Sequence, residues 1–124
     1  MAKKYLDPPI VEIETTLHQL LEDKIQIPQP GAVRDYLSLH PDILGLVTSV
    51  CTTTLGRFGM GTQLVLEVYR DPEIVDHYLT LYVRQEQYQD NILDVLEDVR
   101  KLYELELARK SGWILVTTDF SPPK

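Results

Sequence analysis

The chain has 124 residues, of which 44% are hydrophobic and 25% are charged, and its formal net charge is −7 at pH 7. These values are typical of one globular domain of ordinary size. No apolar run approaches the roughly 20 residues of a membrane span, and MAKKYLDPP at the amino terminus lacks the apolar core of a secretory signal, so we expect a cytoplasmic protein.

The negative charge is concentrated in one part of the sequence. Between Asp71 and Asp98, eight acidic residues stand against Arg84 alone, whereas the other 11 acidic and 11 basic residues cancel. Such a surface repels phosphate backbones, so we expect no nucleic-acid ligand, while a basic partner protein remains compatible. The alternative is a solvated face that keeps the protein soluble. The candidate partner surface comprises Asp71, Glu73, Asp76, Asp90 and Asp94.

The first expected element is an amphipathic helix from Pro8 to about Lys24. Its apolar residues recur three and four positions apart, and Asp7 before Pro8 suits an amino-terminal cap. The segment VEIETT within it is also compatible with a short strand. Two prolines and a glycine in the following IQIPQPG predict a loop or an extended connector.

Two further helices should follow. A short one is predicted over 32–39, and His40-Pro41 interrupts it because a residue before proline avoids the helical region. Pro41 then begins a longer helix that Gly59 ends. Its buried stripe contains Cys51, which we expect to be a structural thiol. The glycines that follow lie after a helix, where carbonyl groups repel anions, so they predict a cap and turn, not a phosphate loop.

The segment from Gln63 to Arg84 has the pattern of a β-hairpin. QLVLEVYR and HYLTLYVR alternate with period two around the acidic turn DPEIVD. Pairing Arg70 with His77 places only aliphatic residues on one face, and a slip of one residue destroys this separation, so the pattern predicts this register or one shifted by two residues. The other face then carries the polar and aromatic residues Glu67, Tyr69, Tyr78, Thr80, Tyr82 and Arg84.

A second long helix and a third strand complete the expected fold. The helix runs from about Ile92 to Gly112, with Leu102 on its inward face, and the strand covers 113–120. The crossover makes this strand parallel to the second strand, and we expect it beside the first strand and antiparallel to it. The prediction is a single α+β domain over 1–124, with helices over 8–58, a ββαβ unit over 63–120 and a tail over 121–124.

The aromatic face of the hairpin is the candidate ligand site. Carboxylate, phenol and guanidinium groups together are able to bind a polar ligand or to transfer protons. The alternative is a cross-strand tyrosine pair and a Glu67–Arg84 ion pair beneath a second packed layer. A ligand site predicts a pocket between this face and a helix. The candidate residues are Glu67, Tyr69, Tyr78, Tyr82, Arg84 and Asp119.

No motif in the sequence indicates a metal, a cofactor or a catalytic residue. His18, His40 and His77 do not stand at ligand spacing from one another, and none neighbours Cys51. The run from Asp71 to His77 matches no calcium-loop spacing. We therefore expect no cofactor and no catalytic residue, and the sequence favours a protein that is not an enzyme.

Three segments resemble a group of short bacterial proteins without an assigned activity. They are LVLEVYRDPE (64–73), YLTLYVR (78–84) and GWILVTTDFSPP (112–123). The resemblance covers the second half of the chain and implies a bacterial, cytoplasmic, single-domain protein, but it transfers no active-site residue.

Together these features favour a non-enzymatic interaction or regulatory module with an acidic surface, one that also forms a homodimer through the exposed edges of a short sheet. Two alternatives stay open. One is an enzyme or small-ligand-binding protein that uses the tyrosines, and the other is an antitoxin-like acidic partner of a basic protein.

Overall fold

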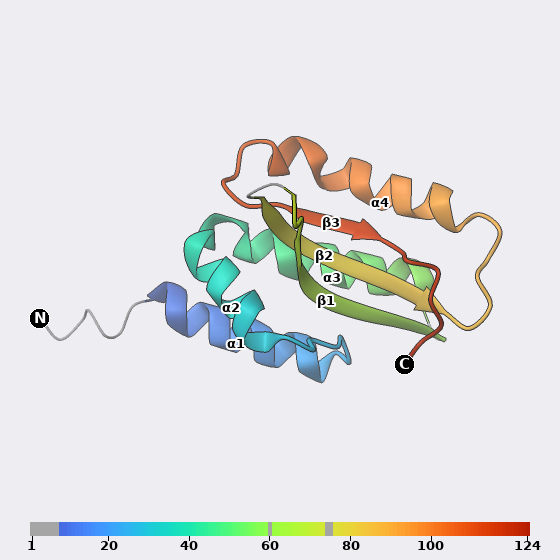
Figure 1. The fold of residues 1–124 in the computed structure, drawn as a ribbon, viewed down its shortest axis with the longest axis horizontal. Coiled ribbons are helices and arrows are strands. Elements are labelled where there is room, and N and C mark those ends of the chain that lie inside the picture. The colour runs from blue at the N-terminus through green and yellow to red at the C-terminus, as the bar shows by residue number, and fades with distance from the viewer. Residues whose placement is uncertain (1–7, 60, 74–75) are drawn as a thin grey trace, which may run out of the picture.

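The computed structural model describes residues 8–59, 61–73 and 76–124 (Figure 1). The order of elements, helices first and then a ββαβ unit, is the α+β arrangement that the sequence predicted. The elements are α1 (Pro8–Glu22), α2 (Pro30–Leu39), the 3₁₀ turn η2 (Pro41–Ile43), α3 (Leu44–Phe58), β1 (Thr62–Arg70), β2 (His77–Gln85), α4 (Ile92–Leu107) and β3 (Ile114–Thr117).

The hairpin of β1 and β2 has the predicted antiparallel register. Arg70 pairs with His77, and Leu66 pairs with Leu81. Alternation excludes a slip of one residue, which would move every leucine to the opposite face, and the position of the turn selects this register over one shifted by two residues. Asp71 opens the turn as predicted: its Oδ1 accepts the N–H of Glu73 at 2.9 Å. Turn residues 74–75 lie outside the described residues.

The predicted position of the third strand was wrong. The strand order is β1-β2-β3, so β3 lies beside β2 and not beside β1. The predicted parallel relation between β2 and β3 is confirmed, with Leu79 opposite Ile114 and Leu81 opposite Val116. The strand is also shorter than predicted, because only Ile114–Thr117 pairs with the sheet.

The connector between α1 and α2 explains why β3 cannot pair with β1. Gln26 forms a parallel bridge with Val65. The N–H of Gln26 donates to the carbonyl of Leu64 at 2.9 Å, and its carbonyl accepts the N–H of Leu66 at 2.8 Å. The outer edge of β1 is therefore occupied there, and the free edge of β2 receives β3.

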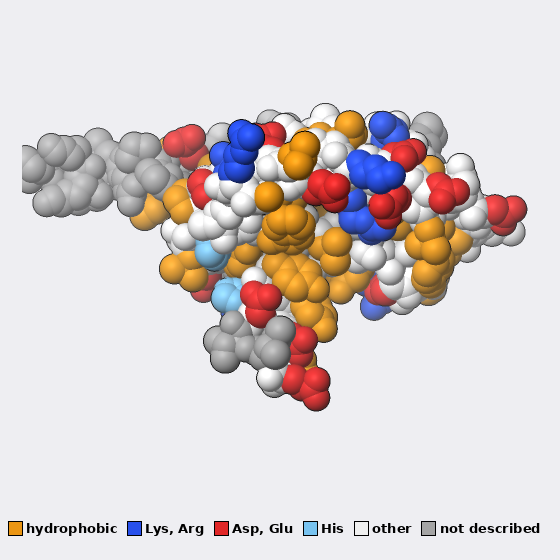
Figure 2. All heavy atoms as spheres, turned by 90° about the horizontal axis from the view of Figure 1, so that it is seen from above, with side chains coloured by type: hydrophobic (Ala, Val, Ile, Leu, Met, Phe, Trp, Pro, Cys, Tyr) orange, Lys and Arg blue, Asp and Glu red, His pale blue; other side chains and the backbone are white. Residues whose placement is uncertain are grey.

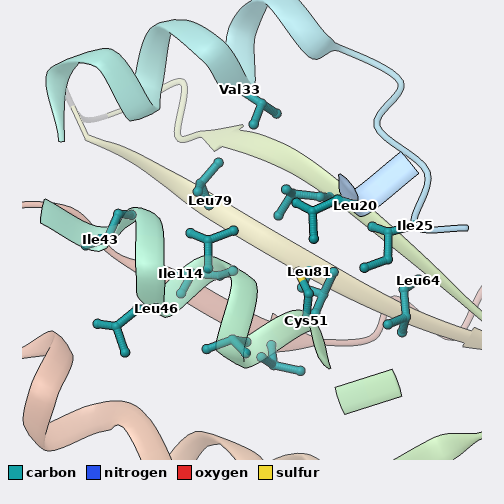
Figure 3. Close-up of a cluster of buried hydrophobic side chains, with 14 of the residues drawn as sticks. Leu20, Ile25, Val33, Ile43, Leu46, Cys51, Leu64, Leu79, Leu81 and Ile114 are labelled. Carbon is teal, nitrogen blue, oxygen red and sulfur yellow. The ribbon is translucent and has the colours of Figure 1, made fainter. Parts of the chain in front are cut away.

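Helices α1 to α4 pack toward one side of the sheet, here called the inner face. Figure 1 looks onto the opposite side, with α3 behind the strands. Figure 3 shows Leu20 of α1, Val33 of α2 and Cys51 of α3 converging on Leu81 and Ile114 of the sheet. Burying each such leucine or isoleucine stabilises the fold by about 1.5–3 kcal/mol. The strands contribute Leu64, Leu66, Val68, Leu79, Leu81, Val83, Ile114 and Val116 to this face.

The first half of the chain follows the predicted pattern with small differences. In α1, Leu17 and Leu20 are buried, but Ile10 and Leu21 lie at the edges of the apolar stripe and are exposed. The predicted cap, Asp7, lies outside the described residues. Pro41 begins a 3₁₀ turn before the α-helix proper.

Two further boundaries concern α3 and α4. Gly59 ends α3 with φ +69°, and its N–H donates to the carbonyl of Leu55 at 2.8 Å. Helix α4 ends at Leu107, short of the predicted Gly112, because the N–H of Lys110 bonds only three residues back, to Leu107. Leu102, predicted to face inward, is 56% exposed.

Helix α4 runs beside β3 and contacts α3 (Figure 1). Arg100 of α4 donates from Nη1 to the outward carbonyl of Val116 at 2.8 Å, which satisfies part of the edge of β3. Over the described ranges, none of the helices combines the length and the apolar character that crossing a lipid bilayer requires.

Candidate functional site

The candidate ligand residues lie on the side of the sheet opposite the inner face. We call this side the tyrosine face. The register with β3 adds two neighbours, because Thr80 lies opposite Leu115 and Tyr82 lies opposite Thr117. The face comprises Gln63, Val65, Glu67, Tyr69, Tyr78, Thr80, Tyr82, Arg84, Leu115 and Thr117.

No helix among the described residues lies over the tyrosine face (Figure 1). Among the described residues, the second packed layer of the alternative interpretation is therefore absent from this face. Tyr69 is 39% exposed, and its ring lies 5.2 Å from that of Tyr78, centroid to centroid, in the predicted cross-strand pair. Burial by its neighbours raises the pKa of Tyr78, and the nearby Tyr69 and Asp71 raise it further. This end of the sheet presents aromatic surface to solvent.

The other end of the face is closed by an ion pair between the sheet and the tail. Arg84 donates from Nη2 to Oδ2 of Asp119 at 2.8 Å and from Nε to Oδ1 at 3.2 Å. Arg84 is therefore paired with Asp119 and not with Glu67. The guanidinium also lies 5.3 Å from the ring centroid of Tyr82. The bond from Arg84 lowers the pKa of Asp119 to about 2, and the N–H of Ser121 also favours the charged carboxylate.

The tail continues across the ends of the strands after this ion pair. The hydroxyl of Tyr88 donates to the carbonyl of Ser121. Gln63 of β1 then binds the backbone of Lys124 twice, at 2.9 and 3.1 Å. Residues 121–124 pair with no strand, but the tail covers the Arg84 end of the tyrosine face (Figure 1).

Two polar groups on the tyrosine face lack a partner. Thr80 is 2% exposed, and its Oγ1 is the one buried side-chain oxygen or nitrogen within the described ranges that has no hydrogen-bond partner. Glu67 is half-buried, and in the part of the chain that the structure describes no ion pair or side-chain hydrogen bond is found for it. With Arg84 neutralised by Asp119, the net charge of the face comes from Glu67.

The acidic residues that we grouped as a partner surface lie in two separate places. Asp71, Glu73 and Asp76 lie in the hairpin turn, next to the exposed tyrosines. Asp90 and Asp94 lie at the start of α4, beyond the other end of β2. A nine-residue strand spans roughly 27 Å, so one small contact cannot include both groups.

The structure brings together a set of residues that sequence reasoning did not connect. A hollow of about 680 Å³ opens where the tyrosine face meets the carboxyl end of α2. Figure 2 shows hydrophobic side chains gathered on this side of the molecule, with pale blue histidines next to them and acidic groups below. The lining includes Tyr36, His40, Asp76, His77, Tyr78 and Trp113.

The sequence predicted that a ligand site on the tyrosine face would have a pocket between this face and a helix. The hollow is a different recess from one built on the candidate ligand residues, because neither Glu67 nor Arg84 lines it. The one signal in the sequence was the pair Gly112-Trp113, where a glycine directly precedes an aromatic residue. A Cβ at Gly112 would lie 2.7 Å from the Cβ of His40, so this position requires glycine. The sequence does not reveal that His40 is the neighbour.

Cys51 is fully buried in the core, as predicted, and burial raises the pKa of its thiol to about 12. Among residues 8–59, 61–73 and 76–124, no three His, Cys, Asp or Glu side chains gather as metal ligands would. Comparison with known proteins adds no assignment: no family model, no curated protein and no solved structure matches the chain.

Proposed function

We propose that this protein is an interaction module that binds a basic, partly apolar segment of a partner protein on the exposed half of the tyrosine face. The supporting observation is the contrast across a single sheet: helices pack on the inner face, whereas Tyr69 and Trp113 are each 39% exposed on the other side. Exposed aromatic residues are enriched where proteins dock, and an exposed apolar patch is a typical contact site.

The charges around the patch favour a cationic partner. Asp71, Glu73 and Asp76 border it in the hairpin turn, and Glu67 lies on the same face with no ion pair among the described residues. Arg84 does not offset these groups, because Asp119 neutralises it. Complementary charge speeds encounter and excludes partners of the same sign. A lysine- or arginine-rich segment with apolar residues matches both features of the face.

The main alternative occupant is a second copy of this chain. A dimer with twofold symmetry through the same patch brings the same residues of each copy together. With a net charge of −7 per chain and carboxylates around the patch, such a contact places like charges opposite each other. We therefore favour a basic partner, and the homodimer becomes an outcome of the test.

A random peptide display library tests the proposal without a known partner. The selected peptides should be enriched in lysine or arginine together with aliphatic or aromatic residues. Tyr69→Ser should weaken their binding by at least about tenfold, since buried aromatic anchors dominate interface energies. Leu105→Ser is the matched control, because Leu105 is 81% exposed on α4, and it should leave binding unchanged.

Three results contradict the proposal. The library yields no binder, the binders are acidic, or they bind the Tyr69→Ser variant as well as the original protein. Light scattering adds a fourth. A stable dimer that Tyr69→Arg converts to monomers means that the occupant is a second copy and not a basic partner.

A further inference from the structure

The hollow beside the tyrosine face has walls that are fixed before anything binds. The hydroxyl of Tyr36 on α2 accepts the backbone N–H of Trp113 at 2.9 Å, which ties α2 to the start of β3. The ring of Tyr36 lies 4.5 Å from that of His40 and 5.3 Å from that of His77, centroid to centroid. Three separate parts of the chain therefore hold these aromatic rings together.

A second set of bonds holds the loop between α4 and β3 in place. The carboxylate of Asp42 accepts the N–H of Ser111 at 2.7 Å and its hydroxyl at 2.9 Å. The Ser111 Oγ also lies 2.9 Å from Nδ1 of His40. Because the Asp42 carboxylate takes the serine proton, the Ser111 hydroxyl oxygen accepts the N–H of His40 at Nδ1. The bonds from Ser111 lower the pKa of Asp42, which stays ionised.

The chemistry of the lining selects for a positive group. Tyr36, Tyr78 and Trp113 contribute aromatic rings, whose faces attract cations. Asp76 contributes a carboxylate at the rim, next to the acidic turn. None of the described side chains that line the hollow is lysine or arginine. Lys110, directly before Ser111 in the sequence, interacts with the Asp42 carboxylate.

The hollow is continuous with the proposed partner surface. Tyr78 and Leu115 belong to the tyrosine face and also line the hollow. A segment lying on the exposed half of the face therefore passes its opening. Interfaces commonly concentrate their binding energy where one side chain of the partner enters such a recess.

We propose that the hollow receives the cationic end of one lysine or arginine side chain of the bound segment. This inference rests on the proposed function and specifies its anchor. The ring faces of Trp113 and Tyr78 contact the alkyl stem and the charge, and Asp76 pairs with the charge at the rim. Lysine and arginine both have an alkyl stem and a positively charged end. Exchanging the two residues in the bound peptide shows which of them the hollow prefers.

A double-mutant cycle with a selected peptide tests the anchor. Each lysine or arginine of the peptide is replaced in turn by norleucine, and lysine and arginine are also exchanged. At the position whose side chain enters the hollow, norleucine should weaken binding at least about tenfold. A loss of this size is expected because the peptide loses a partly desolvated charge contact. With Asp76→Asn the same replacement should cost much less, because the carboxylate that pairs with the charge is gone.

Glu73→Gln is the matched control for that cycle. It removes the same charge from the same turn, but Glu73 does not line the hollow. The effect of norleucine should be unchanged in this variant. Equal affinity of the norleucine peptides for the original protein, or an equal reduction of the effect in Glu73→Gln, overturns the anchor while the interaction surface stands.

A small probe separates failure of the anchor from failure of the proposed function. n-Butylammonium should shift the NMR signal of the Trp113 indole in a saturable way, whereas n-butanol should not, and Asp76→Asn should abolish the shift. If the library yields no peptide but the ammonium shift appears, the hollow is a cation site and the peptide-binding proposal fails. If butanol shifts Trp113 as strongly as butylammonium does, the cationic selectivity is wrong.

Discussion

The two faces of the sheet are built from the same strands but differ in how they are covered. On the inner face Leu66, Leu79 and Leu81 are each 0% exposed beneath helices from the first half of the chain. On the tyrosine face Tyr69 is 39% exposed, and the short tail covers only one end. Because side chains alternate along each strand, one side of the sheet packs against the helices in the core. The other side stays available for contacts with other molecules.

The largest expected difference between the faces is in stability. Leu81→Ala removes buried methyl groups from the central strand and should lower the free energy of unfolding by about 2–5 kcal/mol. Tyr69→Ala, on the opposite face of the neighbouring strand, should cost less than about 1 kcal/mol. Urea denaturation followed by circular dichroism measures both. Equal losses contradict the distinction between a packed and an open face.

The hollow offers a second comparison, between two glycines. Gly112→Ala places a Cβ 2.7 Å from that of His40, so the loop must shift, at a cost of about 1–3 kcal/mol. Gly56→Ala is the control: its Cβ meets nothing within 4 Å, and alanine in a helix should stabilise α3 by up to about 1 kcal/mol. The two variants should shift the midpoint of urea unfolding in opposite directions. A shift in the same direction for both contradicts the close approach of Gly112 to His40.

The closed end of the tyrosine face depends on the Arg84–Asp119 pair. The side chain of Arg84 is 7% exposed and that of Asp119 is 35% exposed. Asp119→Asn leaves the guanidinium buried with a weaker partner and should cost about 1 kcal/mol, less than a fully buried pair because solvent screens the carboxylate. Adding Arg84→Met to Asp119→Asn should recover part of this loss, since no buried charge then remains. A double variant that is less stable than the single one contradicts this account.

The same pair should make stability depend on pH. The pKa of Asp119 is lowered to about 2 in the fold from an ordinary value of 3.8. A lowered pKa means that its stabilisation is complete above the unfolded value and is lost as the pH falls through the folded one. The stability difference between the original protein and Asp119→Asn should therefore be constant above about pH 5, shrink as the pH falls and disappear only below about pH 2. Urea midpoints at a series of pH values measure it. A difference that grows on acidification contradicts the pairing.

The parts of the fold that were predictable depend on residues close together in sequence. Leu66 and Leu81 face each other because both strands alternate around one turn, so the pattern predicted their shared face and limited the register to this one or one shifted by two residues. The position of β3 did not follow, because it depends on Gln26 occupying the edge of β1. Alternation describes the faces of a strand and contains no information about its edges.

The candidate site was predictable only in part, for the same reason. The alternation placed Tyr69 and Tyr78 together correctly. The hollow depends on His40, His77 and Trp113, which are far apart in sequence and meet through tertiary packing. Tyr36 joins them, and its single bond to the backbone of Trp113 has no sequence signature.

The smallest perturbation uses the single cysteine and the single tryptophan of the chain, one for each side of the sheet. Cys51 is 0% exposed in the core beneath the inner face, whereas Trp113 is 39% exposed beside the tyrosine face. The native protein should leave Cys51 unreactive toward a disulfide reagent, because the buried thiol, with a pKa of about 12, forms little thiolate. Acrylamide should quench Trp113 fluorescence readily under the same conditions.

These two probes also report on binding and unfolding separately. Unfolding in urea should expose Cys51, and its reaction should follow the loss of circular dichroism because the thiol becomes accessible only when α3 separates from the sheet. A selected basic peptide should protect Trp113 from acrylamide and leave the native Cys51 as unreactive as before. Rapid native labelling of Cys51 contradicts the sealed inner face, and a Trp113 that acrylamide cannot reach contradicts the open side on which the proposed binding depends.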